Sequence, residues 1–157
     1  MAELKTKIML DVGCGASRQH GWIGIDRREL PGVDLVHDLE VFPWPLEDDS
    51  CSVIKCSHVV EHIKPWMQIP FMDECWRVLG HDDALLISTP YGGSYRYNMD
   101  PTHCSPWVED TVGYFAMGYP LYNIYKPKPW RIEAGPYWSQ NGDLEVALRT
   151  IKDGADA

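Results

Sequence analysis

Five short apolar runs, each ended by a turn signal, occupy the first ninety residues of the chain. They are brief and rich in β-branched residues or leucine, which is typical of strands covered on both faces. Between the fourth and fifth runs, apolar residues at helical spacing predict a helix that begins near Ile69 and ends at Gly80. A strand–helix–strand connection favours parallel pairing of the two strands. The predicted strands cover residues 8–12, 21–26, 33–37, 52–57 and 84–89.

The rest of the chain is less regular. A short helix is predicted over residues 57–63 and another over 108–115, while the region 91–129 is otherwise rich in turn residues. Two final strands, 130–133 and 144–151, are joined by the turn Gln140–Asn141–Gly142. We therefore expect one α/β domain over residues 1–157, with a mostly parallel sheet of about seven strands and a C-terminal antiparallel hairpin.

Composition excludes several classes of protein. The net charge of −9 argues against nucleic-acid binding, which depends on neutralising phosphates. No apolar run approaches the roughly 20 residues that cross a bilayer, so no membrane association is expected. The N-terminus does not have the pattern of a signal peptide, and the five cysteines form no CxxC pair. We expect reduced thiols and a cytoplasmic location; the sequence does not indicate an oligomeric state.

A glycine turn follows the first predicted strand, in the segment Leu10–Asp11–Val12–Gly13–Cys14–Gly15. Gly13 and Gly15 allow a sharp turn and bring bare backbone N–H groups against a ligand. A dinucleotide-binding fingerprint would continue to a third glycine, but Arg18 stands at that position. A nicotinamide oxidoreductase is therefore disfavoured. Taken alone, the two glycines are also compatible with a plain strand-ending turn.

Acidic residues end the next two predicted strands. Asp26 lies where a carboxylate can accept hydrogen bonds from both ribose hydroxyls of an adenosine. The third strand ends in His37–Asp38–Leu39, where a carboxylate and a backbone amide can contact an adenine edge. Each acid alone is also compatible with a turn or a helix cap. Three such signals, in order and all at strand carboxyl ends, favour an adenosyl site.

In this order the segments LDVGCG, GIDRR, HDLEVFPWPLEDDSCSVIKCSHVVEHI, ECWRVLG and ALLISTP resemble the successive motifs of class I S-adenosylmethionine-dependent methyltransferases. The resemblance is closest to the type 11-like group and covers residues 8–90. Asp100–Pro101–Thr102–His103 resembles a further motif of a small bacterial and phage subset. The resemblance implies a Rossmann-like fold, with S-adenosyl-L-methionine bound by residues 1–90, a substrate-side lid over 91–129 and terminal strands in 130–157.

The resemblance also implies a set of cofactor-binding residues. One group would hold the methionine part, a second the ribose, a third the adenine, and a fourth would line the methyl-transfer pocket. The first helix is reduced to a loop, because only Ala16 to His20 separate Gly15 from the next strand, so Arg18 or Arg27 is expected to replace its dipole at the methionine carboxylate. The methionine part would be held by Asp11, Gly13, Cys14 and Gly15 with Arg27, and the ribose by Asp26. The adenine would be held by Asp38 and Leu39, and the methyl-transfer pocket would be lined by Ser57 and His58.

Three histidines are candidate catalytic bases, because a neutral imidazole titrates near physiological pH. His103 is preferred, since the motif around it follows the fifth strand where a loop would cover the substrate. His58 and His62 would share one face of the predicted helix. The segment 58–62 also matches the HxxEH pattern of inverted zinc proteases, but Pro65 interrupts the helix that such an enzyme needs. Some methyltransferase families hold a divalent ion with an ExxEH segment and a distant histidine, but His58 replaces the first glutamate here, so no metal is predicted.

The sequence thus predicts methyl transfer from S-adenosylmethionine to an acceptor that is a small molecule or a glycan. An aromatic group is a candidate acceptor pocket, although core packing explains it equally well. The alternative is a non-catalytic S-adenosylmethionine-binding module or partner subunit, which the small size and shortened first helix favour. The aromatic group consists of Trp44, Tyr91, Tyr95, Tyr97, Trp107 and Tyr114.

Overall fold

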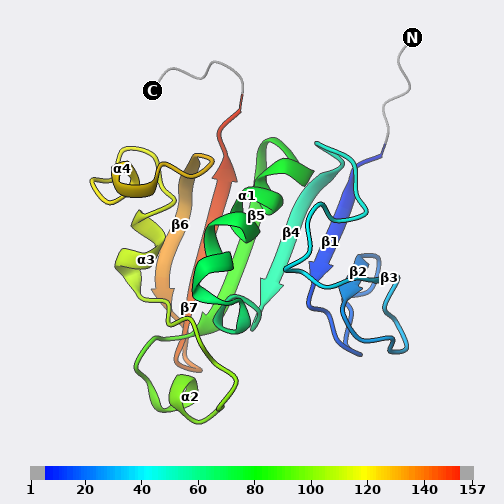
Figure 1. Cartoon of the computed structure of the whole chain (residues 1–157), viewed down its shortest axis with the longest axis horizontal. Helices are drawn as coiled ribbons and strands as arrows, with labels where there is room; N and C mark the ends of the chain where they lie inside the picture. Colours follow the sequence, from blue (N-terminus) through cyan, green and yellow to red (C-terminus); the bar gives the residue numbers. More distant parts are fainter. Residues whose placement is uncertain (1–5, 153–157) are drawn as a thin grey trace.

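The structure is a computed structural model that describes residues 6–152. Its centre is a seven-stranded sheet with the strand order β3-β2-β1-β4-β5-β7-β6 (Figure 1). The first five strands run parallel, and β7 is antiparallel to both β5 and β6. The mostly parallel sheet with a terminal antiparallel hairpin is confirmed. The strands are β1 (Ile8–Val12), β2 (Ile23–Asp26), β3 (Leu35–Val36), β4 (Cys51–Ser57), β5 (Leu79–Pro90), β6 (Trp130–Trp138) and β7 (Asp143–Thr150).

Helices are few and short. The longest, α1, crosses one face of the sheet between β4 and β5, and its Pro70 lies in the first turn, where a missing N–H costs little (Figure 1). Residues 13–22, between β1 and β2, contain no helix, as the sequence predicted. The helices are η1 (Val60–His62), η2 (Pro65–Met67), α1 (Gln68–Val78), α2 (Tyr95–Asn98), α3 (Glu109–Gly113) and α4 (Tyr122–Tyr125).

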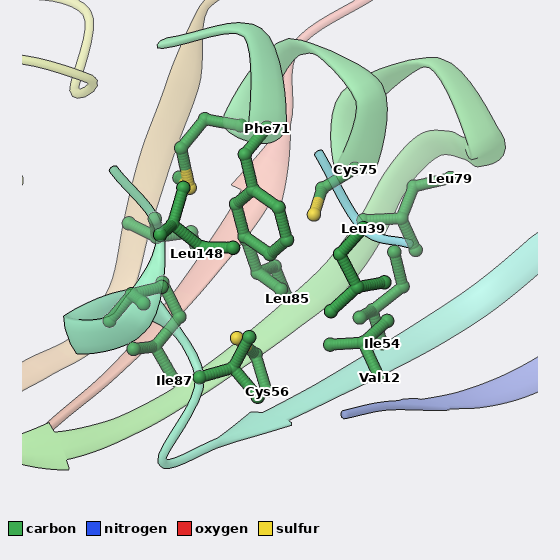
Figure 2. Close-up of a cluster of buried hydrophobic side chains, with 14 of the residues drawn as sticks. Val12, Leu39, Ile54, Cys56, Phe71, Cys75, Leu79, Leu85, Ile87 and Leu148 are labelled. Carbon is green, nitrogen blue, oxygen red and sulfur yellow. The ribbon is translucent and has the colours of Figure 1, made fainter. Parts of the chain in front are cut away.

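The hydrophobic core lies between the sheet and α1. Phe71 and Cys75 point from α1 toward Ile54 on β4 and Leu85 on β5, with Leu148 of β7 beside them (Figure 2). All five side chains are fully buried. Burial of side chains of this size stabilises the fold by about 1.5–3 kcal/mol each, so this layer contributes substantially to stability.

The opposite face of the central strands is largely uncovered. Because strand side chains alternate between faces, the neighbours of the buried residues Cys56, Ile87 and Val146 point away from α1. Among them, Leu86 is 41% exposed, and Lys55 borders a shallow cavity of about 410 Å³ on this face. The described chain therefore builds two layers, a sheet and one layer of helices.

Several element boundaries differ from the prediction. The helix was predicted to end at Gly80 and the fifth strand to begin at residue 84, but β5 begins directly after α1, at Leu79. Its first residues form a bulge, since the pairing with β4 jumps from Cys51↔Leu79 to Val53↔Ala84 and Asp82 has φ +57°. The helix predicted over 57–63 is reduced to the single turn η1. Polar residues in the bulge gave it the pattern of a turn.

Residues 91–129 contain only short elements, as predicted. Helix α3 occupies the middle of the helix predicted over 108–115, and two isolated bridges, Tyr91↔Trp107 and Ala116↔Trp130, tie the segment to itself and to β6. The hairpin turn falls at residues 139–142 as predicted, although β6 is longer than expected. Among the described residues, no helix is both long and apolar enough to span a membrane.

Candidate functional site

The glycine loop after β1 and the end of β2 form one connected unit at the carboxyl edge of the parallel strands. Gly13 and Gly15 have φ of +61° and +55°, a backbone region that favours glycine. Gly13 N donates to Ile25 O at 2.8 Å, and Gly15 N donates to Asp26 Oδ2 at 2.9 Å. A Cβ on Gly13 would lie 2.5 Å from a methyl of Val59. Backbone conformation and close approach therefore both require a glycine at this position.

The Asp26 carboxylate is buried and already hydrogen-bonded. Its Oδ1 accepts from Arg28 N at 2.9 Å and from Arg28 Nε at 3.2 Å. Burial alone would raise the pKa of Asp26, but the hydrogen bonds from Arg28 and Gly15 outweigh it and hold the pKa below its usual value. The Arg28 side chain is 61% exposed. A ribose that reached this carboxylate would compete with an exposed guanidinium, and Arg28 was not among the site residues predicted from the sequence.

Asp38 and Leu39 follow β3 at the same edge. His37 N donates to Asp26 O at 2.9 Å, so the two strand ends are adjacent. Asp38 is exposed, and its Oδ1 accepts from Glu40 N in a tight turn. Leu39 is buried, and its carbonyl accepts from the indole of Trp44. The structure thus brings Gly15, Asp26 and Asp38 to one edge of the sheet.

Asp11 and Cys14 are buried on the far side of the glycine loop. Asp11 Oδ2 accepts from Gln19 N at 3.0 Å and lies 3.6 Å from Lys55 Nζ. Cys14 Sγ packs where a Cβ on Gly24 would stand, 2.6 Å away, and burial raises its thiol pKa. Both side chains thus help to hold the loop against the sheet.

Arg18 takes part in the same loop. Its Nε donates to Gly32 O at 2.8 Å and its Nη1 to Trp22 O at 2.5 Å. These bonds secure the segment that replaces the first helix. The Arg18 side chain thus pairs with the backbone of the loop, whereas Arg27 is exposed directly after β2.

His58 lies between two buried carboxylates. Its Nδ1 is 3.4 Å from Glu61 Oε1 and its Nε2 is 3.3 Å from Asp143 Oδ2. The contact with Glu61 raises the pKa of His58, burial opposes this, and the charge of Asp143 adds to the rise. Its φ of +55° is unusual for a residue with a side chain. Because η1 begins only at Val60, His58 and His62 do not share a helix face, and that prediction is wrong.

The other two candidate histidines meet each other. The rings of His62 and His103 are 4.7 Å apart in an edge-to-face arrangement. Ser57, at the end of β4, borders the cavity on the uncovered face of the sheet. Glu61 lies between His58 on one side and the pair His62 and His103 on the other. It was not among the predicted site residues, although the HxxEH pattern contains it.

The six aromatic residues do not form one pocket. Trp44 is buried in the core against Phe71, and Tyr95 is 82% exposed. Trp107 and Tyr114 line a cavity of about 500 Å³ beside the N-terminal end of α1, together with parts of η2 and of residues 104–106. Of the six predicted aromatic residues, only Trp107 and Tyr114 thus line this cavity.

No protein-family model matches this sequence. A probable S-adenosylmethionine-dependent methyltransferase of Mycolicibacterium smegmatis is 33% identical over 99 residues, which cover 52% of this chain and 37% of that protein. The chain thus spans little more than a third of the length of this curated relative.

Solved structures share the fold. An S-adenosylmethionine-dependent methyltransferase of Archaeoglobus fulgidus superposes with a TM-score of 0.62 at 17% identity, over 93% of this chain and 86% of that one. A Burkholderia thailandensis 1,6-didemethyltoxoflavin N1-methyltransferase, crystallised with S-adenosylhomocysteine, gives 0.65 at 12% identity, over 94% and 72%. The chain thus has the fold of S-adenosylmethionine-dependent methyltransferases, and over 99 residues its sequence is similar to that of a probable member of this class.

Proposed function

We propose that this chain binds S-adenosylmethionine at the carboxyl edge of β1, β2 and β3 and transfers its methyl group to an acceptor. The observation that carries the proposal is the hydrogen bond from Gly15 N to Asp26 Oδ2, which joins the glycine loop and the acid after β2 into one unit. Asp38 lies at the end of the adjacent strand. In this proposal Gly15 contacts the methionine part of the ligand, Asp26 the ribose and Asp38 the adenine.

The proposed reaction is an in-line displacement at the sulfonium methyl. The nucleophile forms the new bond to carbon while the sulfur keeps the electron pair of the broken bond and leaves as a neutral thioether. The leaving group needs no acid, so positioning and exclusion of water can supply most of the acceleration. A base is needed only when the nucleophile carries a proton, and His103, His58 and His62 are our candidates for it.

The acceptor in this proposal is a small molecule or a glycan, with residues 91–129 as its lid. The cavity of about 500 Å³ beside α1 supports this choice, because its size suits a small molecule and Trp107 and Tyr114 supply aromatic surface. A cytoplasmic location belongs to the same proposal and is supported by the five cysteines, all of which are free thiols.

Calorimetric titration with S-adenosylhomocysteine tests the cofactor. We expect saturable binding that Asp26→Ala weakens by at least about tenfold, since a ribose-facing carboxylate loses its hydrogen bonds. Glu29→Ala, which removes an exposed acid three residues further on, should leave the affinity unchanged. No binding at millimolar ligand would refute the proposal, and an Asp26→Ala affinity equal to that of the wild type would remove Asp26 from the site.

The uncovered face of the sheet favours a second candidate, a non-catalytic S-adenosylmethionine-binding subunit. Leu86 is exposed at the centre of that face, and the first helix is absent. Such a protein would bind the cofactor and show no turnover of radiolabelled S-adenosylmethionine against a panel of small-molecule and glycan acceptors. Turnover by the isolated chain would exclude it.

A further inference from the structure

We propose that Glu61, His62 and His103 form a binding site for one divalent transition-metal ion. One potential ligand atom of each residue lies within 4.8 Å of those of the other two. Ligands bound at about 2.0–2.2 Å from an ion stand at most about 4.4 Å apart, so side-chain shifts of less than about 1 Å would close the site. The proposal concerns metal binding and does not depend on the methyl-transfer proposal.

The backbone holds the two contributing segments together. Glu61 and His62 come from η1, whereas His103 comes from the loop after α2. The amides of Cys104 and Ser105 both donate to Glu61 O, at 2.8 and 3.2 Å, and Ser105 Oγ donates to Ile63 O. The loop is thus fixed on η1 directly beside His103, and the site is built before any ion arrives.

Hydrogen bonds assign the same tautomer to both imidazoles. His103 Nδ1 lies 2.7 Å from Tyr97 O, which can only accept, so this nitrogen carries the proton. The Thr102 hydroxyl donates its proton to Asp100 Oδ1 at 2.7 Å and therefore accepts from His62 Nδ1 at 3.1 Å. In its neutral form each ring therefore keeps a lone pair on Nε2. A histidine that ligates a metal has this arrangement, with its other N–H donated to an oxygen.

Glu61 supplies a second and independent indication of a cation. The residue is 0% exposed, and its Oε2 accepts from Thr89 Oγ1 at 2.9 Å. Its Oε1 accepts no hydrogen bond within the described chain, and the nearest ring nitrogen, His58 Nδ1, is 3.4 Å away. An unsatisfied buried carboxylate oxygen is costly, and a bound cation would satisfy it. Asp100 Oδ2, 3.6 Å from His103 Nε2, adds further negative charge.

The donor set selects the class of ion. Two imidazoles and one carboxylate suit Zn²⁺, Co²⁺, Fe²⁺ or Mn²⁺, whereas Mg²⁺ and Ca²⁺ prefer sites made of oxygen alone. Three protein ligands also leave coordination positions open. His62 is exposed, so an ion can reach the site from solvent.

The test uses the full chain without a polyhistidine tag, stripped of metal with a chelator and titrated with Zn²⁺ by calorimetry and with Co²⁺ by visible absorption. We expect one ion per chain and binding of Mg²⁺ at least about 100-fold weaker. His62→Ala and His103→Ala should each weaken Zn²⁺ binding by at least about tenfold. The matched control is His20→Ala, because His20 is exposed on the glycine loop, and its affinity should equal that of the wild type.

Three results would overturn the proposal. The first is no heat and no Co²⁺ absorption at millimolar metal. The second is Zn²⁺ binding that neither His62→Ala nor His103→Ala weakens; because His62 is exposed, its variant should fold, and circular dichroism checks this. The third is binding that Cys104→Ser abolishes while both histidine variants retain it, since this would assign the metal to the exposed thiol.

Discussion

At the scale of single residues, Asp26 is held in two ways at once. It belongs to the glycine loop through Gly15 N, and it also pairs with the exposed guanidinium of Arg28. The first contact shapes the site, whereas the second covers the carboxylate on its solvent side. A carboxylate whose charge is already stabilised in this way stays ionised as the pH falls, so protonation of Asp26 should not limit ligand binding near neutral pH.

The Arg28 guanidinium leads to a prediction about affinity. Arg28→Ala should strengthen S-adenosylhomocysteine binding by about twofold to fivefold, because the ribose no longer displaces an exposed ion pair. Calorimetry on the two proteins measures the effect. Lys126→Ala, which removes an exposed cation directly after α4, serves as the control for net charge. Weaker binding by Arg28→Ala than by Lys126→Ala would instead make Arg28 a ligand contact.

Gly13 leads to a prediction about stability. Gly13→Ala should lower the free energy of unfolding by about 2–3 kcal/mol, because the new Cβ meets Val59 in addition to the strain of a positive φ. Gly21→Ala is matched to it, since Gly21 has φ +81° but no heavy atom within 4 Å of its added Cβ, and should cost only about 1 kcal/mol. Urea denaturation compares them. Equal losses would mean that Val59 moves aside freely.

At the scale of elements, side chains of α1 anchor the loop that follows β3 by hydrogen bonds to its backbone. Buried Glu74 on α1 accepts from Trp44 N at 2.7 Å and pairs with Arg77 at 2.6 Å. Arg77 also donates to the carbonyl of Leu46 at 3.0 Å. One helix turn thus fixes the segment after Asp38 through its backbone.

This pairing predicts that Arg77→Ala lowers the free energy of unfolding by about 2–4 kcal/mol, because it leaves the buried Glu74 carboxylate without its cation. Asp48 pairs with the same guanidinium but is 74% exposed, so Asp48→Ala should cost less than about 0.5 kcal/mol. Thermal or urea unfolding of the two variants separates the contributions. A loss of the same size in both variants would contradict the assignment to Glu74.

The elements that the sequence predicted well are those whose signal is local. The first strand and the hairpin of β6 and β7 combine apolar residues with turn residues at their ends, and both were found. The start of β5 was missed because Gly80 to Asp83 have the composition of a turn, although bulged pairing with β4 keeps them in the sheet. Only the partner strand makes that segment regular, and no local pattern carries this information.

The candidate site likewise contains residues that local sequence predicted and residues that only the tertiary structure brings together. Gly13, Gly15 and Asp26 follow directly from strand ends, and their common edge was predicted. The pairing of His62 with His103 depends on how the loop after α2 folds back on η1, through amides that donate to Glu61 O. Backbone contacts between distant segments leave no periodicity in the sequence, so this group could not be predicted.

At the scale of the whole molecule, the five cysteines divide by burial. Cys104 is exposed, whereas the other four are buried, and burial raises the pKa of Cys51 to about 11. A thiol reacts as its thiolate, so the native protein should show one fast equivalent with an aromatic disulfide reagent and five in denaturant. Cys104→Ser should abolish the fast phase. A second fast thiol would show that the core opens on the time scale of the assay.

The uncovered face of the sheet also has a thermodynamic consequence. Apolar side chains such as Leu86 and Met9 are already in contact with water in the folded chain, so unfolding hydrates less new hydrocarbon than in a protein with helices on both faces. The heat capacity of unfolding per residue should then fall below the usual range of about 12–15 cal/mol/K. A smaller heat capacity flattens the dependence of stability on temperature, which moves cold denaturation further from the physiological range.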